Sequence, residues 1–135
     1  MSGTGPELLL LKHETDNPHY DLLLSAGGVS GRWILRGLPD EDGGAGRGSR
    51  GGKERLALED DSGAAAAPSG EVEDLWGKGP VEIVESCMME IVHRGKRKIV
   101  FRAEGRALKG EYCLLLRKWG LHTKRRLWVF FKLGD

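Results

Sequence analysis

Three side chains suited to metal binding lie close together near the start of the chain. An apolar run at residues 8–11 is followed by a lysine and then by His13. Turn-forming residues follow at 16–18, and a second, largely apolar run begins with His19 and Asp21. This order predicts a strand, a turn and a second strand. Side chains two apart on a strand share a face, so His19 and Asp21 are expected to project together, with His13 reaching the same pocket across the turn.

Two imidazoles and one carboxylate form a ligand set that suits Zn²⁺ or Mn²⁺ and leaves positions for water or a phosphate oxygen. A histidine at the end of a strand is also commonly a half-exposed residue without a ligand. The spacing of these residues alone leaves both interpretations open.

The same segment resembles a known family. The order Lys-His-x5-His-Tyr-Asp-Leu-x-Leu, at residues 12–24, is similar to the opening motif of the 3′-phosphoesterase domain of bacterial and archaeal ATP-dependent DNA ligase D. Weaker similarities to that domain follow in the same order at residues 33–37, 55–60, 77–84, 108–112 and 127–132. The resemblance therefore spans nearly the whole chain.

The resemblance implies a metal-dependent hydrolase of DNA repair by non-homologous end joining. Such a domain removes a 3′-terminal ribonucleotide and then the 3′-phosphate, so the substrates are 3′ ends of DNA or of a DNA–RNA primer. By motif position, His13, His19 and Asp21 correspond to the metal ligands. The implied cofactor is Mn²⁺, with Zn²⁺ or another divalent cation as alternatives, and separate ligase or polymerase chains are the candidate protein partners.

Three further residues correspond to catalytic positions of that family. Arg55 falls where the family has an arginine that contacts phosphate, and Arg36 falls at the position of a lysine, after a gap of one residue. Glu59 matches the acidic residue of the Glu-Asp-His motif. The resemblance thus implies Arg55, Arg36 and Glu59 as catalytic residues, whereas an arginine at the end of a strand is as commonly an ordinary surface cation.

Two departures from the family pattern bear on activity. Leu23 stands where the family has an arginine two residues after the aspartate, and the segment after Glu59 lacks the histidine of the Glu-Asp-His motif. Three functions stay open: a divergent 3′-phosphoesterase with weakened activity, a catalytically inactive nucleic-acid or partner-binding barrel of the same fold, and a small-ligand or protein-interaction barrel. In the third, the tryptophans would line a cavity; they are Trp33, Trp76, Trp119 and Trp128.

The elements that must position these residues are predicted to be strands throughout. Alternating or continuous apolar runs, separated by glycine-rich or charged turns, occur with no long helical period. The pattern favours an all-β fold, an antiparallel β-barrel or a closed sandwich. The resemblance implies a barrel, so we expect an antiparallel closed β-barrel. The expected strands beyond the two around His13 lie at residues 29–35, 55–59, 80–86, 88–93, 98–104, 106–117 and 126–133.

Length and composition set the outer limits. The 135 residues predict one domain, residues 1–135, in which the glycine-rich segments 37–54 and 60–69 are expected to be flexible loops. The 21 basic and 20 acidic residues nearly cancel, so a nucleic-acid surface must be a local patch. No apolar run is long enough for a signal sequence or a membrane span, and we expect a cytoplasmic monomer without membrane contact.

Overall fold

The regular secondary structure of the protein consists of β-strands. The computed structural model describes residues 7–26, 29–38, 54–60, 71–74, 76–117 and 126–134, and no helix occurs within these ranges. The predicted all-β class is confirmed. The ten strands are β1 (Leu8–His13), β2 (His19–Ala26), β3 (Val29–Leu35), β4 (Arg55–Glu59), β5 (Glu71–Asp74), β6 (Gly77–Cys87), β7 (Met89–Arg94), β8 (Lys98–Glu104), β9 (Lys109–Leu116) and β10 (Leu127–Gly134).

All ten strands join one antiparallel sheet in the order β5-β6-β1-β2-β3-β4-β10-β9-β8-β7. The terminal strands of this order, β5 and β7, do not pair with each other in the part of the chain that the structure describes. The predicted closure of the barrel is therefore not observed, and the sheet is open. β6 passes directly into β7 through Met88, so the chain itself connects these two regions, and no ladder of hydrogen bonds joins them within the described residues.

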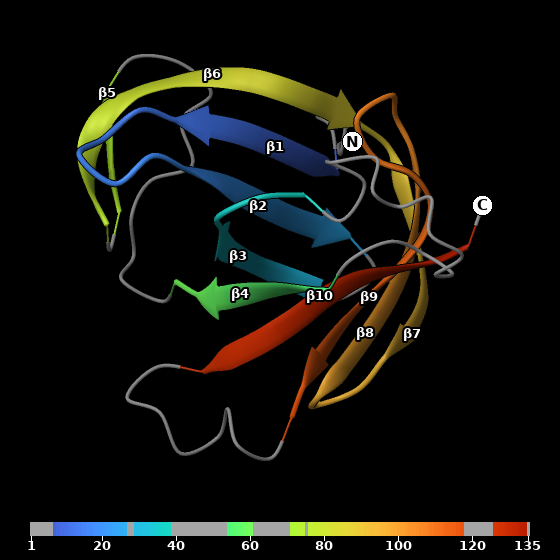
Figure 1. Ribbon diagram of the computed structural model, residues 1–135. Coiled ribbons are helices and arrows are strands. Elements are labelled where there is room, and N and C mark those ends of the chain that lie inside the picture. The colour runs from blue at the N-terminus through green and yellow to red at the C-terminus, as the bar shows by residue number, and fades with distance from the viewer. Residues whose placement is uncertain are drawn as a thin grey trace.

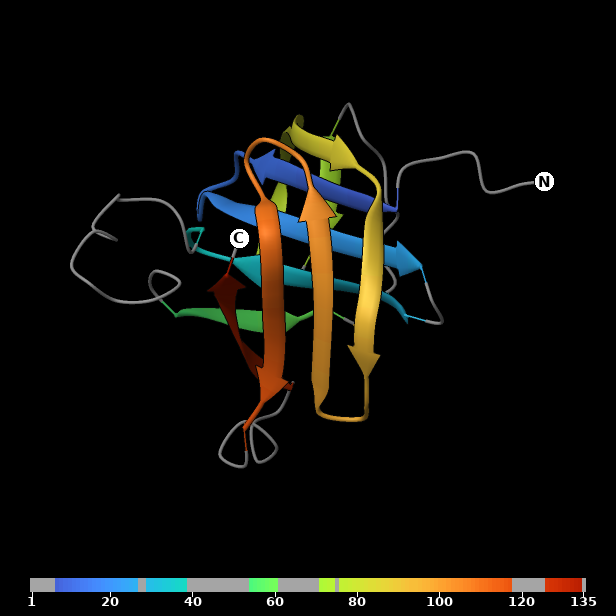
Figure 2. The same ribbon diagram turned by 90° about the vertical axis from the view of Figure 1, so that its right-hand side faces the viewer.

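The sheet curls so that one face encloses the core. Figure 2 shows β7, β8 and β9, coloured yellow to orange, lying crosswise over β1, β2 and β3. Alternation along the strands sends every second side chain inward, and most of the described inner positions are apolar. Phe101, Tyr112 and Phe130 stack on one another with ring centroids 5.5–6.1 Å apart. Leu8, Leu10, Leu22, Leu24, Trp33, Leu35, Ala57, Leu114 and Trp128 belong to the same buried cluster.

A buried carboxylate connects the open side of the sheet. Glu85 on β6 accepts backbone hydrogen bonds from Arg106 and Ala107, both at 2.6 Å, and from Leu108 at 3.4 Å, in the turn between β8 and β9. Three otherwise orphaned amides thus converge on one charged acceptor. Glu85 ties β6 to the opposite end of the strand order where no ladder does so.

Glu85→Ala is expected to lower the free energy of unfolding by about 2–3 kcal/mol, because hydrogen bonds to a charged group contribute more than neutral ones and the amides lose their acceptor. Chemical denaturation measures this loss. Glu90→Ala, at an exposed position on β7, is the matched control and should leave stability within about 0.5 kcal/mol of wild type. Equal stabilities for the two variants would contradict the bridging role of Glu85.

The two predicted flexible loops fall almost wholly at residues 39–53 and 61–70, outside the described residues. Their described ends are ordered by packing: Gly37 and Leu38 are buried after β3, and Asp60 is buried after β4. Within the described ranges, no helix has the length and apolar content needed to cross a bilayer.

Candidate metal centre

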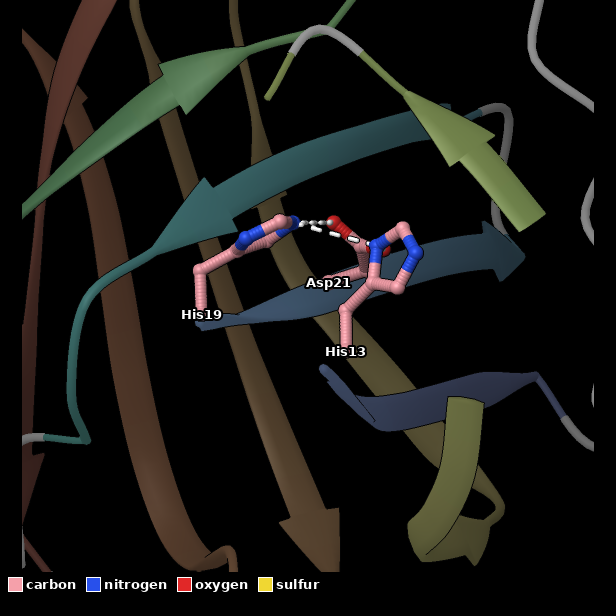
Figure 3. Close-up of side chains that lie close together, drawn as sticks. All are labelled: His13, His19 and Asp21. Carbon is pink, nitrogen blue, oxygen red and sulfur yellow. Dashed lines mark hydrogen bonds and ion pairs between the residues drawn. The ribbon is translucent and has the colours of Figure 1, made fainter. Parts of the chain in front are cut away.

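The facing ends of β1 and β2 position the three predicted ligands (Figure 3). In their antiparallel register His13 lies opposite His19, and Leu11 lies opposite Asp21. Residues directly opposite each other share a face of the sheet. Leu10 and Leu22, which alternate with these residues along β1 and β2, belong to the inner core. His13, His19 and Asp21 therefore all lie on the opposite, outer face of the sheet. Each is buried, and one ligand atom from each residue lies within 4.8 Å of those of the other two, so the predicted convergence is confirmed.

Backbone carbonyl groups fix the orientation of both imidazoles. His13 Nε2 lies 3.1 Å from the carbonyl oxygen of Gly79, and His19 Nδ1 lies 2.6 Å from that of Asn17. A carbonyl oxygen only accepts, so each of these ring nitrogens carries the proton and donates. In the neutral rings the other nitrogens, Nδ1 of His13 and Nε2 of His19, then present lone pairs to the centre of the site.

The inward-facing atoms make an electron-rich cluster. The two nitrogens lie 3.2 Å apart, and the Asp21 carboxylate oxygens lie 3.2 Å from His13 Nδ1 and 3.4 Å from His19 Nε2. Two lone pairs and an anion at these separations repel one another unless a proton or a metal cation lies among them. The donor set, two neutral imidazole nitrogens and a carboxylate oxygen, with both rings held from behind, fits a Zn²⁺ or Mn²⁺ ion.

A hairpin from a distant part of the sequence covers this cluster. Figure 1 shows β5 and β6 beside the ends of β1 and β2. The turn between them places the Trp76 ring edge-on to His19, with ring centroids 5.2 Å apart. Gly77 has a φ of 123°, which residues with a Cβ rarely adopt, so glycine permits this tight reversal. Gly79 follows and supplies the carbonyl that holds His13.

Gly79→Ala is expected to destabilise the fold by about 1–3 kcal/mol and to weaken metal binding, since a Cβ there would collide with the carbonyl oxygen of Glu14. The backbone must then shift, which moves the acceptor of His13. Gly134→Ala, where no atom lies within 4 Å of the added Cβ, is the control and should change neither quantity. Denaturation curves and a metal titration by calorimetry measure the two effects. Unchanged metal affinity in Gly79→Ala would show that this carbonyl is dispensable.

Arg32 is a charged member of the site that the sequence patterns did not reveal. It is buried on β3, and its Nη2 lies 3.8 Å from Asp21 Oδ2. In the register of β2 with β3, Arg32 lies opposite Leu23, the position at which the resembling family has an arginine. The guanidinium therefore enters the same face of the sheet from the neighbouring strand. The only available signal was a charge inside the otherwise apolar run of residues 29–35.

Arg36 and Arg55, predicted as catalytic, lie together beside the cluster. Both line a cavity of about 310 Å³ whose other walls are mainly apolar. Arg36 lies over the Trp76 ring, 4.8 Å from its centroid, and Trp76 in turn contacts His19. Arg55 Nε donates to the carbonyl oxygen of Leu38 at 3.1 Å. Arg36 is thus held one aromatic ring away from the predicted metal ligands, and Arg55 lines the same cavity from β4.

Glu59, the third residue predicted as catalytic, is not brought to the cluster. It lies opposite Trp33 in the β3–β4 register, and Trp33 belongs to the inner core. The Glu59 carboxylate accepts from Trp128 Nε1 at 2.8 Å and lies 3.7 Å from Arg126 Nε. Its ordered partners are therefore on the inner face, whereas the predicted metal ligands are on the outer face.

The remaining histidines do not supply the missing catalytic histidine within the described residues. His93 is exposed on β7, and His122 lies outside the described ranges. No protein-family model matches the chain, and no curated protein matches it.

Proposed function

We propose that the protein is a divalent-metal-dependent phosphoesterase that acts on the 3′ ends of nucleic acids, with His13, His19 and Asp21 as metal ligands. The observation that carries the proposal is the pair of histidines whose carbonyl partners turn unprotonated nitrogens toward a buried carboxylate. This function belongs to DNA end repair in the cytoplasm, where separate ligase or polymerase chains are the candidate partners.

The charges of the site favour a phosphate ester as substrate. The negative charge of Asp21 is offset by Arg32, and both histidines would be neutral when they act as metal ligands. A divalent cation would therefore add its full charge to the site, and a terminal phosphate, which carries about −1.5 to −2 at neutral pH, balances it. A bound divalent metal would supply Lewis-acid polarisation of a nonbridging phosphate oxygen.

The chain's own cations would orient the phosphate and stabilise its charge. Arg32 can offer a planar, charged N–H group to an equatorial oxygen from beside Asp21, the function that the arginine two residues after the aspartate has in the resembling family. Arg36, one aromatic ring away, and Arg55, on the wall of the same cavity, are suited to the next phosphate of the strand or to its sugar edge. The Trp76 ring and the hairpin that bears it limit the access of bulk water to His19.

The proposal predicts that inorganic phosphate is released from a 3′-phosphorylated oligonucleotide only when Mn²⁺ is present. A colorimetric phosphate assay measures this, and the same oligonucleotide with a 3′-hydroxyl end is the control. Turnover should be slower than in a complete family member, because loss of one catalytic donor typically costs about 10²–10³ in rate. Metal binding without any phosphate release would instead support the alternative, a catalytically inactive nucleic-acid-binding domain.

A further inference from the structure

A second hollow lies on the inner side of the sheet, away from the metal ligands. It has a volume of about 430 Å³, within the range of ~300–1,000 Å³ that is usual for small-molecule sites. The start of β3, the turn between β7 and β8 and the start of β10 surround it. Its walls combine apolar surface from Val29, Ile99 and Trp128 with three cations, Arg94, Lys96 and Arg126.

One wall carries a buried donor that needs an acceptor. Trp33 lines this hollow and is 3% exposed, yet its indole Nε1 has no hydrogen-bond partner among the described residues. Burying an N–H without an acceptor is unfavourable, and native proteins rarely leave such a group unsatisfied. An oxygen or ring nitrogen of a bound molecule would satisfy it. The neighbouring Trp128, by contrast, already donates to Glu59 at 2.8 Å.

The positive charge continues beyond the hollow along the turn. Gly95 and Lys96 also line an adjacent hollow of about 540 Å³, together with Arg97 and Lys98. The single carboxylate of the first hollow, Glu59, is engaged by Trp128 and Arg126, and so does not cancel the field of the turn. Cations that extend over two neighbouring hollows match a chain of phosphates better than one small anion.

We propose that this surface, formed by the 430 Å³ hollow and the turn of residues 94–98, binds single-stranded nucleic acid. One nucleotide would occupy the hollow and provide the acceptor for Trp33, while the following phosphates would contact Lys96, Arg97 and Lys98. A flexible single strand can turn a nucleotide into such a recess, whereas the paired bases of a duplex are held in their stack. The site is separate from the metal ligands, since Trp33 faces the inner side of β3 and Arg32 the outer side.

The test measures anisotropy of a fluorescein-labelled dT oligonucleotide of about ten nucleotides, in EDTA so that metal at the His13 cluster is not required. The double variant Lys96→Gln/Arg97→Gln is expected to weaken binding and to reduce the slope of log K against log salt by about 1.4, because each single-strand phosphate contact contributes ~0.7. Arg106→Gln/Lys109→Gln removes the same charge at the exposed opposite turn and should leave both quantities unchanged. Equal losses in the two double variants would overturn the proposal.

Trp33→Phe tests the recess itself, since it removes the N–H and keeps an aromatic ring. Binding should fall about two- to tenfold, the loss typical of one hydrogen bond. The melting temperature will also fall, because the smaller ring leaves part of the core around Trp33 unfilled, so binding is measured well below the transition. Unchanged binding in Trp33→Phe would overturn the recess. Binding to vesicles rich in anionic lipid, but not to the oligonucleotide, would overturn the choice of partner. Neither result depends on phosphoesterase activity, so the proposal for this surface and the proposal for the metal centre are tested independently.

Discussion

Asp21→Asn is expected to lower the affinity for Mn²⁺ or Zn²⁺ by at least about 100-fold. Removing a group that only supports a metal ligand costs up to about 100-fold, and removing the charge of a ligand itself should cost no less. The substitution keeps the size of the side chain and removes only its charge. Because the two inward-facing imidazole nitrogens are neutral, Asp21 is the single anionic ligand of the cluster. Phosphate release should disappear together with metal uptake.

Asp16→Asn is the matched control for this variant. Asp16 is exposed in the turn between the two histidines, so the same chemical change there should leave metal binding as in wild type. Calorimetric titration gives the affinities, and NMR of the histidine side chains reports which rings respond. A denaturation curve must accompany the titration, because Asp21→Asn removes the carboxylate that faces the buried Arg32. A folded Asp21→Asn protein that binds the metal as tightly as wild type would eliminate the proposed centre.

Arg32→Leu is expected to reduce the rate of phosphate release by about 10²–10³, the usual effect of removing one charged donor from a transferring group. Metal affinity should change far less, since Arg32 is not a ligand. The structure provides a sharper variant as well. Leu23 lies directly opposite Arg32, so exchanging the two residues, Leu23→Arg with Arg32→Leu, returns a guanidinium to the same face with the same composition.

The exchange variant should recover most of the rate lost in Arg32→Leu. Recovery of the rate would show that the site needs a charged donor at this position. If Arg32 served only to pack β3, an arginine on the neighbouring strand β2 would not restore the rate. Steady-state kinetics with the 3′-phosphorylated oligonucleotide give kcat and KM separately, and the expected loss is in kcat. A rate that is unaffected by Arg32→Leu would assign phosphate stabilisation to Arg36 or Arg55 instead.

The strands and the ligand cluster were predictable because they depend on short-range pattern. The period of two that places His19 beside Asp21 also predicted that both side chains share one face of the strand, and the turn at residues 16–18 brings His13 opposite His19. Most strand positions followed from the same alternation, since turn residues mark their ends. Glu71–Asp74 was not among the predicted strands, and it is formed by pairing with residues 77–80 of β6.

The features that could not be predicted from the sequence are those that depend on which strands become neighbours in the sheet. Arg32 completes the site only because the register of β2 and β3 sets it opposite Leu23, and no local motif encodes that register. Glu59 follows the family motif in sequence, yet its pairing with Trp33 turns it to the inner face. The missing closure is likewise non-local, because it depends on how β6 continues into β7 and on the Glu85 bridge.

The ligand cluster also has a kinetic consequence for folding. Its three residues lie on one hairpin, and the contact between His13 and His19 spans six residues, whereas the carbonyl of Gly79 is 66 residues from His13. Hairpins form in about 1–10 μs, while contacts of high sequence separation form later. The ligands can therefore meet before the sheet is complete. If the cluster binds a metal as proposed, the hairpin alone would hold all three ligands, and the later pairing of β6 would add the carbonyl of Gly79 that orients His13.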